Sequence, residues 1–337
     1  AVVGGGPAGL IAAEHLAANG VRVTVFEHKR SVGRKFLLAG RGGLNITHGE
    51  SLDELLGRYG SAQSFLEPAI RAFSPDDLRA WCAELGEPTF VGSSDRVFPE
   101  SFRATPLLRA WLQRLAEAGV RIETGHRWTG WAADGSNQFV ASDGKAMTDP
   151  ADATVFALGG ASWPRVGSDG GWVACFRQAG ISVLDLAPAN CGVRVAWSAA
   201  LVRKFEGQPI KNAVFSCGET SARGDGIVTG AGLEGGPIYA LGPAIRSQLA
   251  GQGTAELRID LHTDIATAAL TERLSKRRAK ASITSWLGSA GVSPIAVSLA
   301  REATSNQLPA DPLHLAALLK SLPVKVNSMA PIERAIS

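Results

Sequence analysis

The segment "AVVGGGPAGL" at the start of the chain has the residue types and spacing of a phosphate-binding turn. Gly4, Gly6 and Gly9 form the pattern GxGxxG directly after a short apolar run. In such a turn the first glycine allows the bend, the second lets a pyrophosphate approach the backbone, and the third lets helix and strand pack closely. Free N–H groups and a partial positive charge at the start of the next helix would hold the phosphates. A glycine-rich turn without a ligand is the alternative interpretation.

A carboxylate follows at the position where such sites hold a sugar. Glu27 comes after the first glycine at roughly the 20-residue distance expected of an acid that accepts hydrogen bonds from a ribose. A carboxylate there would repel a 2′-phosphate, so the pattern predicts FAD or NAD rather than NADP. His28, the next residue, belongs to the same expected binding set.

A second glycine cluster with basic residues follows in "GRKFLLAGRGGLNITH", residues 33–48. Arg34, Lys35 and Arg41 lie within this short stretch, where a plain NAD domain would continue into another helical crossover. A loop of this kind suits a longer cofactor whose pyrophosphate is held from two sides, which favours FAD. An ordinary solvated loop is the alternative.

The elements that would position these residues form a β-α-β unit. Apolar residues at helical spacing predict a helix over residues 8–19, with Gly20 as its stop, and "VRVTVF" predicts a strand over residues 21–26. Ser74 is expected to cap another helix, and Leu107, Leu108 and Trp111 are expected in a helix that packs in the core. Strands are expected in "GVRIE", "HRWTGW", "NQFVAS" and "DATVFALGG".

The second half has a different pattern. The proline-containing "LDLAPAN" marks a boundary, after which "CGVRVAW", "NAVFSC", "GIVTG" and "ELRIDL" predict short strands of an antiparallel unit. Helices are expected over residues 263–320, followed by a strand at "PVKV" that heads back towards the first domain.

The chain resembles the BaiN/RdsA-type bacterial flavoproteins, a family of NAD(P)/FAD-dependent oxidoreductases. The resemblance rests on the glycine turn with Glu27, the Arg-Gly-Asn segment, "DRVFPESFRAT", "TVFALGGASWPRVGSDGGW" and "GIVTGAGLEGGPIYALG". It implies an α/β fold: a Rossmann-like, glutathione-reductase-like FAD-binding domain with an inserted β-barrel-like plus helical domain. The expected boundaries are 1–188 for the first part of the FAD domain and 189–325 for the insertion. Residues 326–337 are expected to begin the segment that returns to the FAD domain.

The resemblance also implies which residues meet FAD. Gly4, Gly6, Pro7, Ala8 and Gly9 would contact the pyrophosphate, and Glu27 the adenosine ribose. Trp128 would border the adenine. The other side of the cofactor would be lined by Arg34, Arg41, Gly42, Gly43 and Asn45, and the chain would return to FAD at Leu158, Gly159 and Gly160.

The chain departs from this family in two places. Many members have Gly-Arg-Cys-Asn where this chain has "GRGGLN", so no thiol is expected beside the flavin at that position. Members also continue into a glycine-rich segment that covers the flavin, whereas this sequence stops at "PIERAIS". We therefore expect the piece to be short at both ends, with part of the FAD site outside it.

Composition excludes several classes of protein. Hydrophobic residues make up 45% and the net charge is +3, which fits a globular chain without a concentrated basic face. The four cysteines are scattered without metal-ligand spacing, and no histidine spacing suggests a metal, so no metal is expected. No apolar run is long enough to span a membrane. We expect a cytoplasmic protein with a small-molecule substrate, no membrane partner and nucleic acid disfavoured.

Two motifs suggest other functions. "GAGLEG" contains a second GxGxxG at Gly230, Gly232 and Gly235, for which a helix-start turn is favoured over an NAD(P) site. "RLSKRRAK" is basic, and a solvated helix face is favoured over a nucleic-acid patch. The favoured function is an FAD-binding, NAD(P)H-linked oxidoreductase acting on a small organic molecule. The alternatives are a flavin-bearing RNA-binding or RNA-modifying protein and a non-catalytic flavoprotein. The sequence singles out no catalytic residue; His48 is the histidine nearest to the cofactor loop.

Overall fold

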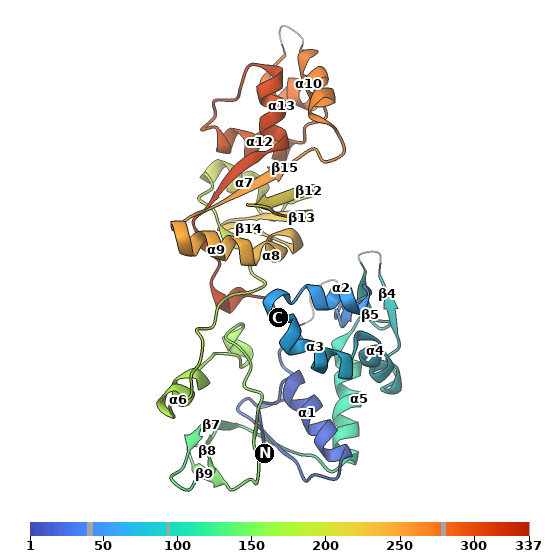
Figure 1. Ribbon diagram of the computed structural model, residues 1–337, viewed down its shortest axis with the longest axis vertical. Helices are drawn as coiled ribbons and strands as arrows, with labels where there is room; N and C mark the ends of the chain where they lie inside the picture. The colour runs from blue at the N-terminus through green and yellow to red at the C-terminus, as the bar shows by residue number, and fades with distance from the viewer. Residues whose placement is uncertain (39–42, 93–94, 278–280, 337) are drawn as a thin grey trace. The chain divides into compact units, whose positions relative to one another are not determined.

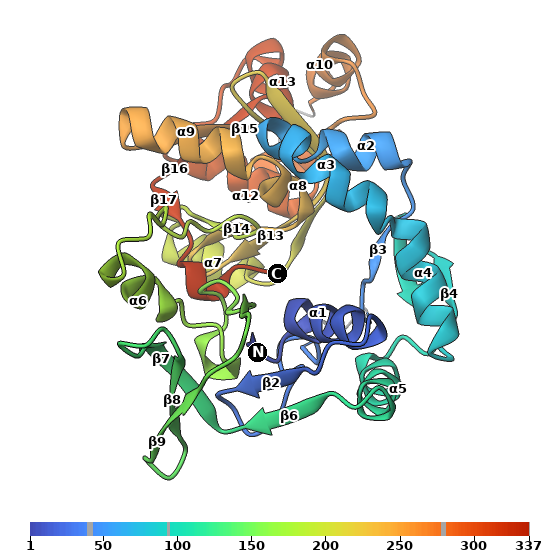
Figure 2. The same ribbon diagram turned by 60° about the horizontal axis from the view of Figure 1, so that its bottom comes forward.

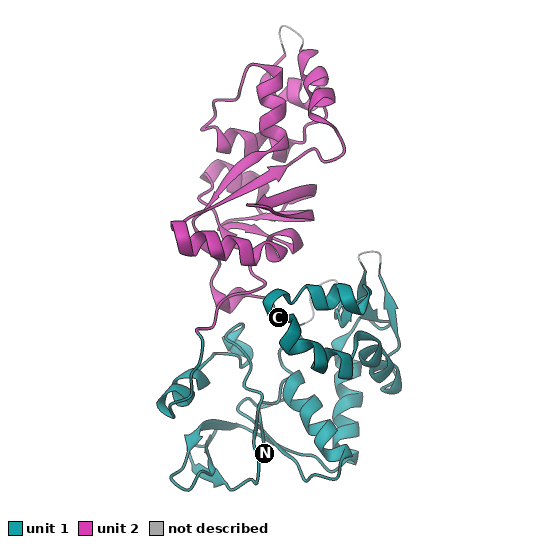
Figure 3. Cartoon of the chain, in the orientation of Figure 1, with its two compact units in different colours: residues 1–184 teal, residues 185–337 magenta. Residues whose placement is uncertain are grey.

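A computed structural model describes residues 1–38, 43–92, 95–277 and 281–336 (Figure 1). The chain divides into two compact units, Ala1–Leu184 and Asp185–Ser337, which are described separately (Figure 3). The predicted site residues Arg41 and Gly42 lie outside the described residues. Among those described, no helix has the length and apolar character needed to cross a membrane.

The first unit is built on a parallel four-stranded sheet with the strand order β10-β1-β2-β6. Val2 of β1 pairs with Val25 on one side and with Val155 on the other, both in parallel. The chain runs outward through β2 to β6 and then returns to β10 beyond β1, so the order reverses between β1 and β10. Open α/β sheets bind ligands at the carboxyl ends of strands at such a switch point. The elements are β1 (Val2–Val3), α1 (Pro7–Ala18), β2 (Thr24–Glu27), β6 (Arg121–Thr124) and β10 (Val155–Phe156).

The predicted β-α-β unit is present, with shifted ends. Helix α1 begins at Pro7 rather than residue 8, because proline fits the first helical position, where no N–H is needed. Strand β2 begins at Thr24 rather than residue 21. Its parallel partner β6 starts pairing only there, and Val21 stays exposed.

Two small antiparallel sheets and several helices complete the first unit. Figure 2 shows the three-stranded sheet of β7, β8 and β9 beside β2 and β6. Ser74 caps α4 in a capping box with Asp77, as predicted, and Leu107, Leu108 and Trp111 of α5 are buried. The elements are α2 (Leu52–Gly57), α3 (Gln63–Ala72), α4 (Pro75–Glu84), α5 (Ala104–Glu117), α6 (Trp172–Gln178), β3 (Thr47–His48), β4 (Thr89–Val91), β5 (Arg96–Pro99), β7 (His126–Trp131), β8 (Asn137–Ala141) and β9 (Ala146–Asp149), with short 3-10 turns at Gly60–Ala62 and Pro164–Val166.

The second unit contains an antiparallel seven-stranded sheet with the order β16-β15-β12-β13-β14-β11-β17. The Asn327 N–H, just after β16, donates to the Arg194 carbonyl of β11, so the sheet curves until its two ends meet, as in a barrel. The strands are β11 (Val193–Arg194), β12 (Pro209–Cys217), β13 (Thr220–Thr229), β14 (Gly232–Glu234), β15 (Ala255–Asp260), β16 (Leu322–Val326) and β17 (Ser328–Met329).

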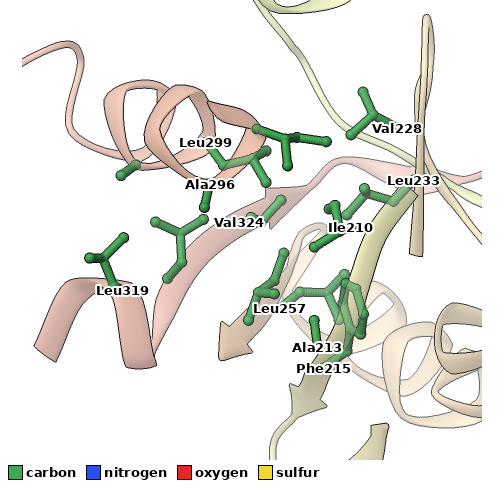
Figure 4. Close-up of a cluster of buried hydrophobic side chains, with 14 of the residues drawn as sticks. Ile210, Ala213, Phe215, Val228, Leu233, Leu257, Ala296, Leu299, Leu319 and Val324 are labelled. Carbon is green, nitrogen blue, oxygen red and sulfur yellow. The ribbon is translucent and has the colours of Figure 1, made fainter. Parts of the chain in front are cut away.

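Helices pack on this sheet and close one continuous apolar core. Phe215 and Leu257 of the sheet, together with Leu299 and Leu319 of the helices, belong to this core (Figure 4). The helices are α7 (Ala199–Phe205), α8 (Gly236–Ala240), α9 (Gly242–Gln252), α10 (Thr267–Ser275), α11 (Ile283–Ser289), α12 (Pro294–Ala303) and α13 (Pro312–Lys320), with a 3-10 turn at Ile332–Arg334.

Two segments of the second unit can be compared with their sequence-based interpretation. The second GxGxxG was expected as a helix-start turn. Its last glycine, Gly235, is the N-cap of helix α8, whereas Gly232–Glu234 forms β14, which pairs with both β11 and β13. The expected return over residues 326–337 stays a prediction. In this chain those residues group with the second unit, and β17 pairs with β11.

Candidate functional site

A cavity of about 720 Å³ opens in the first unit where β1, β2 and β10 end. Its wall combines the turn after β1, the end of β2, residues 157–159 after β10 and the loop of residues 166–171. Pockets for small ligands and cofactors usually have about 300–1,000 Å³. The cavity therefore lies at the switch point of the parallel sheet and has the size of a ligand site.

The glycine turn is packed so tightly that two of its positions tolerate no side chain. Gly4 has φ +113°, and a Cβ there would lie 2.2 Å from the Ala157 oxygen. A Cβ at Gly9 would lie 1.9 Å from the Gly4 oxygen, so the helix can approach the strand only because Gly9 is glycine. By contrast, a Cβ at Gly6 would have no atom within 4 Å. Gly6 thus presents open backbone beside the cavity.

Helix α1 starts at this open backbone without a side-chain cap. Gly6 is the N-cap residue, Pro7 follows, and the first turn contains no acidic residue. The first N–H groups of a helix have no partner within the helix and carry partial positive charge. The start of α1 can therefore bind an anion such as a pyrophosphate.

Glu27 is buried at the end of β2 and lines the cavity. Its Oε2 accepts from the Gly5 N–H at 2.8 Å, and its Oε1 accepts from the Lys29 N–H at 2.7 Å and lies 3.0 Å from His28 Nδ1. Burial alone would raise the pKa of Glu27, but the hydrogen bonds from His28, Lys29 and Gly5 together hold that pKa below its ordinary value. The carboxylate is thus ionised and can accept ribose hydroxyls.

Two basic side chains reach the cavity from the segment after β2. The Gly33 N–H donates to the Gly5 carbonyl at 2.8 Å and holds this segment against the glycine turn. Arg34 and Lys35 then line the cavity. Lys35 Nζ donates to Ser162 Oγ at 2.9 Å, and burial lowers the pKa of Lys35. Arg34 Nε is buried without a partner among the described residues. This guanidinium can therefore donate a charge-assisted hydrogen bond to a phosphate.

Aromatic side chains form another wall. Trp128 is buried, lines the cavity and donates from Nε1 to Asn137 Oδ1 at 3.2 Å. Its ring packs edge-on against Trp131 and Phe156. A flat apolar wall held this firmly suits a heteroaromatic ring such as adenine.

The structure brings most of the predicted site residues together. Those that line the cavity are Gly4, Gly6, Pro7, Ala8, Glu27, His28, Arg34, Lys35, Trp128, Leu158 and Gly159. Gly9, Gly43, Asn45 and Gly160 are not among its lining residues. Gly9 instead packs against Gly4, Gly43 lies against Phe102, and Asn45 is exposed. His48 does not line the cavity; its Nδ1 lies 3.6 Å from Glu50.

Sequence reasoning missed the loop after β10. Val166, Ser168 and Asp169 of this loop line the cavity, as do Trp172 and Cys175 of α6. The signal was the run "GSDGGW" shortly after the Gly-Gly turn, because small residues beside a predicted site permit close approach of a ligand.

An open parallel α/β sheet with an uncapped helix start and a ribose-type acid at its switch point defines a Rossmann-type dinucleotide-binding protein. The open backbone at Gly6 and the Arg34 Nε, which has no partner among the described residues, fit the pyrophosphate of FAD. The Glu27 carboxylate fits the ribose. The profile of the HI0933-like protein Rossmann domain matches residues 1–297, so the chain belongs to this family and its first unit has the Rossmann-type FAD-binding fold. The family resemblance and the fold class predicted from the sequence are thereby confirmed.

Individual relatives are more distant. The chain is 28% identical over 197 residues to the 3-dehydro-bile acid delta(4,6)-reductase of Clostridium scindens, an alignment that covers 58% of this chain and 47% of that protein. The chain thus spans about half the length of this curated relative. Among solved structures it is similar to a 3-ketosteroid-delta4-(5alpha)-dehydrogenase of Rhodococcus jostii (15% identity, 96% and 81% of the two chains, TM-score 0.40) and to THI4 of Thermovibrio ammonificans (16%, 74% and 88%, 0.36).

Proposed function

We propose that the protein binds FAD without a covalent link and is a flavin-dependent oxidoreductase that takes electrons from NAD(P)H. The observation that carries this proposal is the cavity at the sheet switch point, where an uncapped helix start and the buried Glu27 line one wall. Membership of the HI0933-like family supports it.

Each part of the cavity has a task in this proposal. The start of α1 with Arg34 and Lys35 binds the pyrophosphate, Glu27 accepts the ribose hydroxyls, and Trp128 borders the adenine. FAD, when bound, supplies the group that accepts and delivers a hydride. The residues of this chain bind and orient that cofactor and keep its adenosine half out of water.

The substrate class that we propose is a small alicyclic or unsaturated organic molecule. This follows from the relative in Clostridium scindens, which is named a reductase of a 3-dehydro-bile acid. Because the alignment covers about half of that relative, candidate substrates are to be tested directly on the purified protein.

The decisive experiment is an absorption spectrum of the purified protein after incubation with FAD and removal of the free cofactor. Flavin bands that bleach under anaerobic conditions with NADH or NADPH support the proposal. A folded protein that stays colourless contradicts cofactor binding, and a yellow protein that neither nucleotide reduces contradicts the proposed electron donor.

The RNA-binding alternative rested on the basic segment of residues 273–280. Lys276 Nζ pairs with Glu272 at 2.8 Å, and the Arg277 guanidinium lies 4.6 Å from the centre of the Trp286 ring. Residues 278–280 lie outside the described residues. Of the three described cations of this segment, Lys276 and Arg277 thus have partners within the chain, which favours the solvated helix face. Binding to RNA that weakens steeply with salt would restore the alternative.

A further inference from the structure

Three phenylalanines of the first unit form an aromatic cluster outside the cavity. Phe90 of β4, Phe98 of β5 and Phe102 after β5 contact one another, with ring centroids 5.1–6.1 Å apart. Phe102 is 48% exposed, and the other two are half-buried. We call these three residues the aromatic platform; none of them is among the residues that line the cavity. A contiguous apolar patch at the surface of a protein can mark a binding site.

The platform lies on a sheet face where polar residues are expected. Along β5, Val97 and Pro99 are buried. Because side chains alternate along a strand, Arg96 and Phe98 point to the opposite face. Phe90 is the cross-strand partner of Phe98, so it shares that face. The outward face of a small antiparallel sheet is normally polar, and core packing does not account for two aromatic rings there.

Phe102 is held in a backbone conformation that bulky residues rarely adopt. Its φ is +56°, in the left-handed region. The Phe102 N–H donates to the Pro99 carbonyl at 2.9 Å, and the Phe102 carbonyl accepts from the Leu44 N–H at 3.2 Å. Such strained angles persist only where the surroundings enforce them, and they are frequent at ligand sites. The turn thus fixes an exposed ring on the platform before any ligand arrives.

Helix α5 connects the platform with the wall of the cavity. A Cβ on Gly33 would lie 2.6 Å from Leu108 Cδ2, so α5 packs on the segment after β2 that is bonded to Gly5 of the glycine turn. From Leu108 back to Ala104, where α5 begins, is about 6 Å at 1.5 Å per residue. Phe102 comes just before that start. The platform is therefore a near neighbour of the segment that supplies basic residues to the cavity.

A cation is available on the same face of the sheet. The Arg96 side chain is exposed, and no hydrogen bond or ion pair joins it to another residue within the described part of the chain. Its cross-strand neighbour is His48, which lies 3.6 Å from Glu50. Glu50 is already paired with Arg58 at 2.6 Å. The Arg96 guanidinium can therefore pair with a carboxylate from outside the chain.

We propose that the aromatic platform and Arg96 bind the substrate, which is an amphipathic acid with a fused apolar ring system. The platform covers the rings by burying apolar surface, and Arg96 pairs with the carboxylate. The inference rests on the proposed function and narrows its substrate class. A dinucleotide with its adenosine at Trp128 carries its reacting ring at the other end, beyond the pyrophosphate, and the substrate on the platform lies on that side.

The test measures dissociation constants by calorimetry on the FAD-loaded protein, with a 3-dehydro bile acid and its methyl ester as probes. Phe102→Ala and Phe90→Ala should each weaken both probes about 5- to 20-fold, because each removes apolar surface that the rings of the probe bury. Phe102→Leu, which keeps an apolar side chain, should lose less affinity than Phe102→Ala. The matched control is Phe65→Ala on α3, where the side chain is 84% exposed, and it should bind both probes as the wild type does.

A charge variant tests the second half of the proposal. Arg96→Gln should weaken the acid about two- to fivefold, the size expected of an exposed ion pair, and should leave the methyl ester unchanged. Arg22→Gln at another exposed position is the matched control. Equal losses for acid and ester would show that Arg96 does not pair with the carboxylate.

The outcomes separate this inference from the proposed function. A wild type that binds FAD but neither probe overturns the substrate assignment alone. A wild type that binds no FAD overturns the proposed function, and the platform then stands only if the apo-protein binds the probes in a way that depends on Phe102. If the platform variants lose FAD affinity as strongly as probe affinity, the platform holds the cofactor and the assignment is wrong. Thermal melting shows which variants are folded; should an aromatic variant unfold, Arg96→Gln with the two probes decides the question.

Discussion

The two units use their apolar residues differently. In the second unit, buried side chains of the antiparallel sheet and its helices form one continuous core, with Phe215 and Leu257 fully buried. In the first unit the buried residues separate into one cluster around α1 and α5 and another around Phe139 and Trp128. The central strand β1 of the first unit has only two residues, Val2–Val3.

The difference between the two cores shows which groups of the first unit can bind a ligand. The wall of the cavity in the first unit combines apolar side chains such as Trp128 and Phe156 with backbone N–H groups, a carboxylate and buried polar atoms that lack a partner among the described residues. Such groups cost stability until a ligand pairs with them. The second unit gains stability from close packing. Mutations should therefore separate stability in one unit from cofactor binding in the other.

The largest effect is expected in the core of the second unit. Phe215→Ala should lower the free energy of unfolding by about 3–5 kcal/mol, because it removes a fully buried ring and leaves a cavity. Denaturant unfolding measures this change, and Leu313→Ala at an exposed position is the control. In the folded fraction the FAD dissociation constant should be unchanged; a weaker affinity there would contradict the separation of roles.

The glycine turn of the first unit offers a matched pair of substitutions, Gly9→Ala and Gly6→Ala. Gly9→Ala puts a Cβ 1.9 Å from the Gly4 oxygen, so it should lower the free energy of unfolding by about 1–3 kcal/mol and also abolish tight FAD binding. Gly6→Ala places its Cβ in open space and should leave thermal stability unchanged while weakening FAD, because the Cβ faces the pyrophosphate. Equal melting temperatures for the two variants would refute this division.

Replacing the buried acid should act on binding and on pH dependence. Glu27→Gln should weaken FAD about 10- to 100-fold, the expected cost of losing a charged acceptor. The control is Glu117→Gln at an exposed position. Because folding lowers the pKa of Glu27 below 4.5, its contribution to stability is present above that pH and is lost as the pH falls through the lowered value. Unfolding curves of the variant should therefore decline less in acid than those of the wild type.

The smallest effect concerns the thiols. Burial, reinforced by the nearby Glu87, raises the pKa of Cys82 to about 11, and burial also raises the pKa of Cys191 and of Cys217 in the second unit. Cys175 is partly exposed and lines the cavity. Iodoacetamide at pH 8 should modify Cys175 first, and bound FAD should slow that reaction, as peptide mapping by mass spectrometry would show. Equal labelling with and without FAD would place the cofactor elsewhere.

Local patterns were sufficient to predict part of the site. The turn at Gly4, the helix after it and Glu27 at the end of β2 all lie within one β-α-β unit, so spacing alone placed them on the cavity. Gly43 and Asn45 were assigned by resemblance and do not line it, because the conformation of that segment depends on contacts such as the one with Phe102.

The sequence by itself determined the class of fold, the helix start that can hold a diphosphate and the acid that can hold a sugar. These depend on backbone freedom and on periodicity, which neighbouring residues specify. Only the tertiary structure decided that Gly167 packs on the His28 ring and that the Trp172 indole donates to the Gly159 carbonyl after β10. Those contacts join residues more than a hundred positions apart or link separate elements, and only the packing of the whole unit sets their distances.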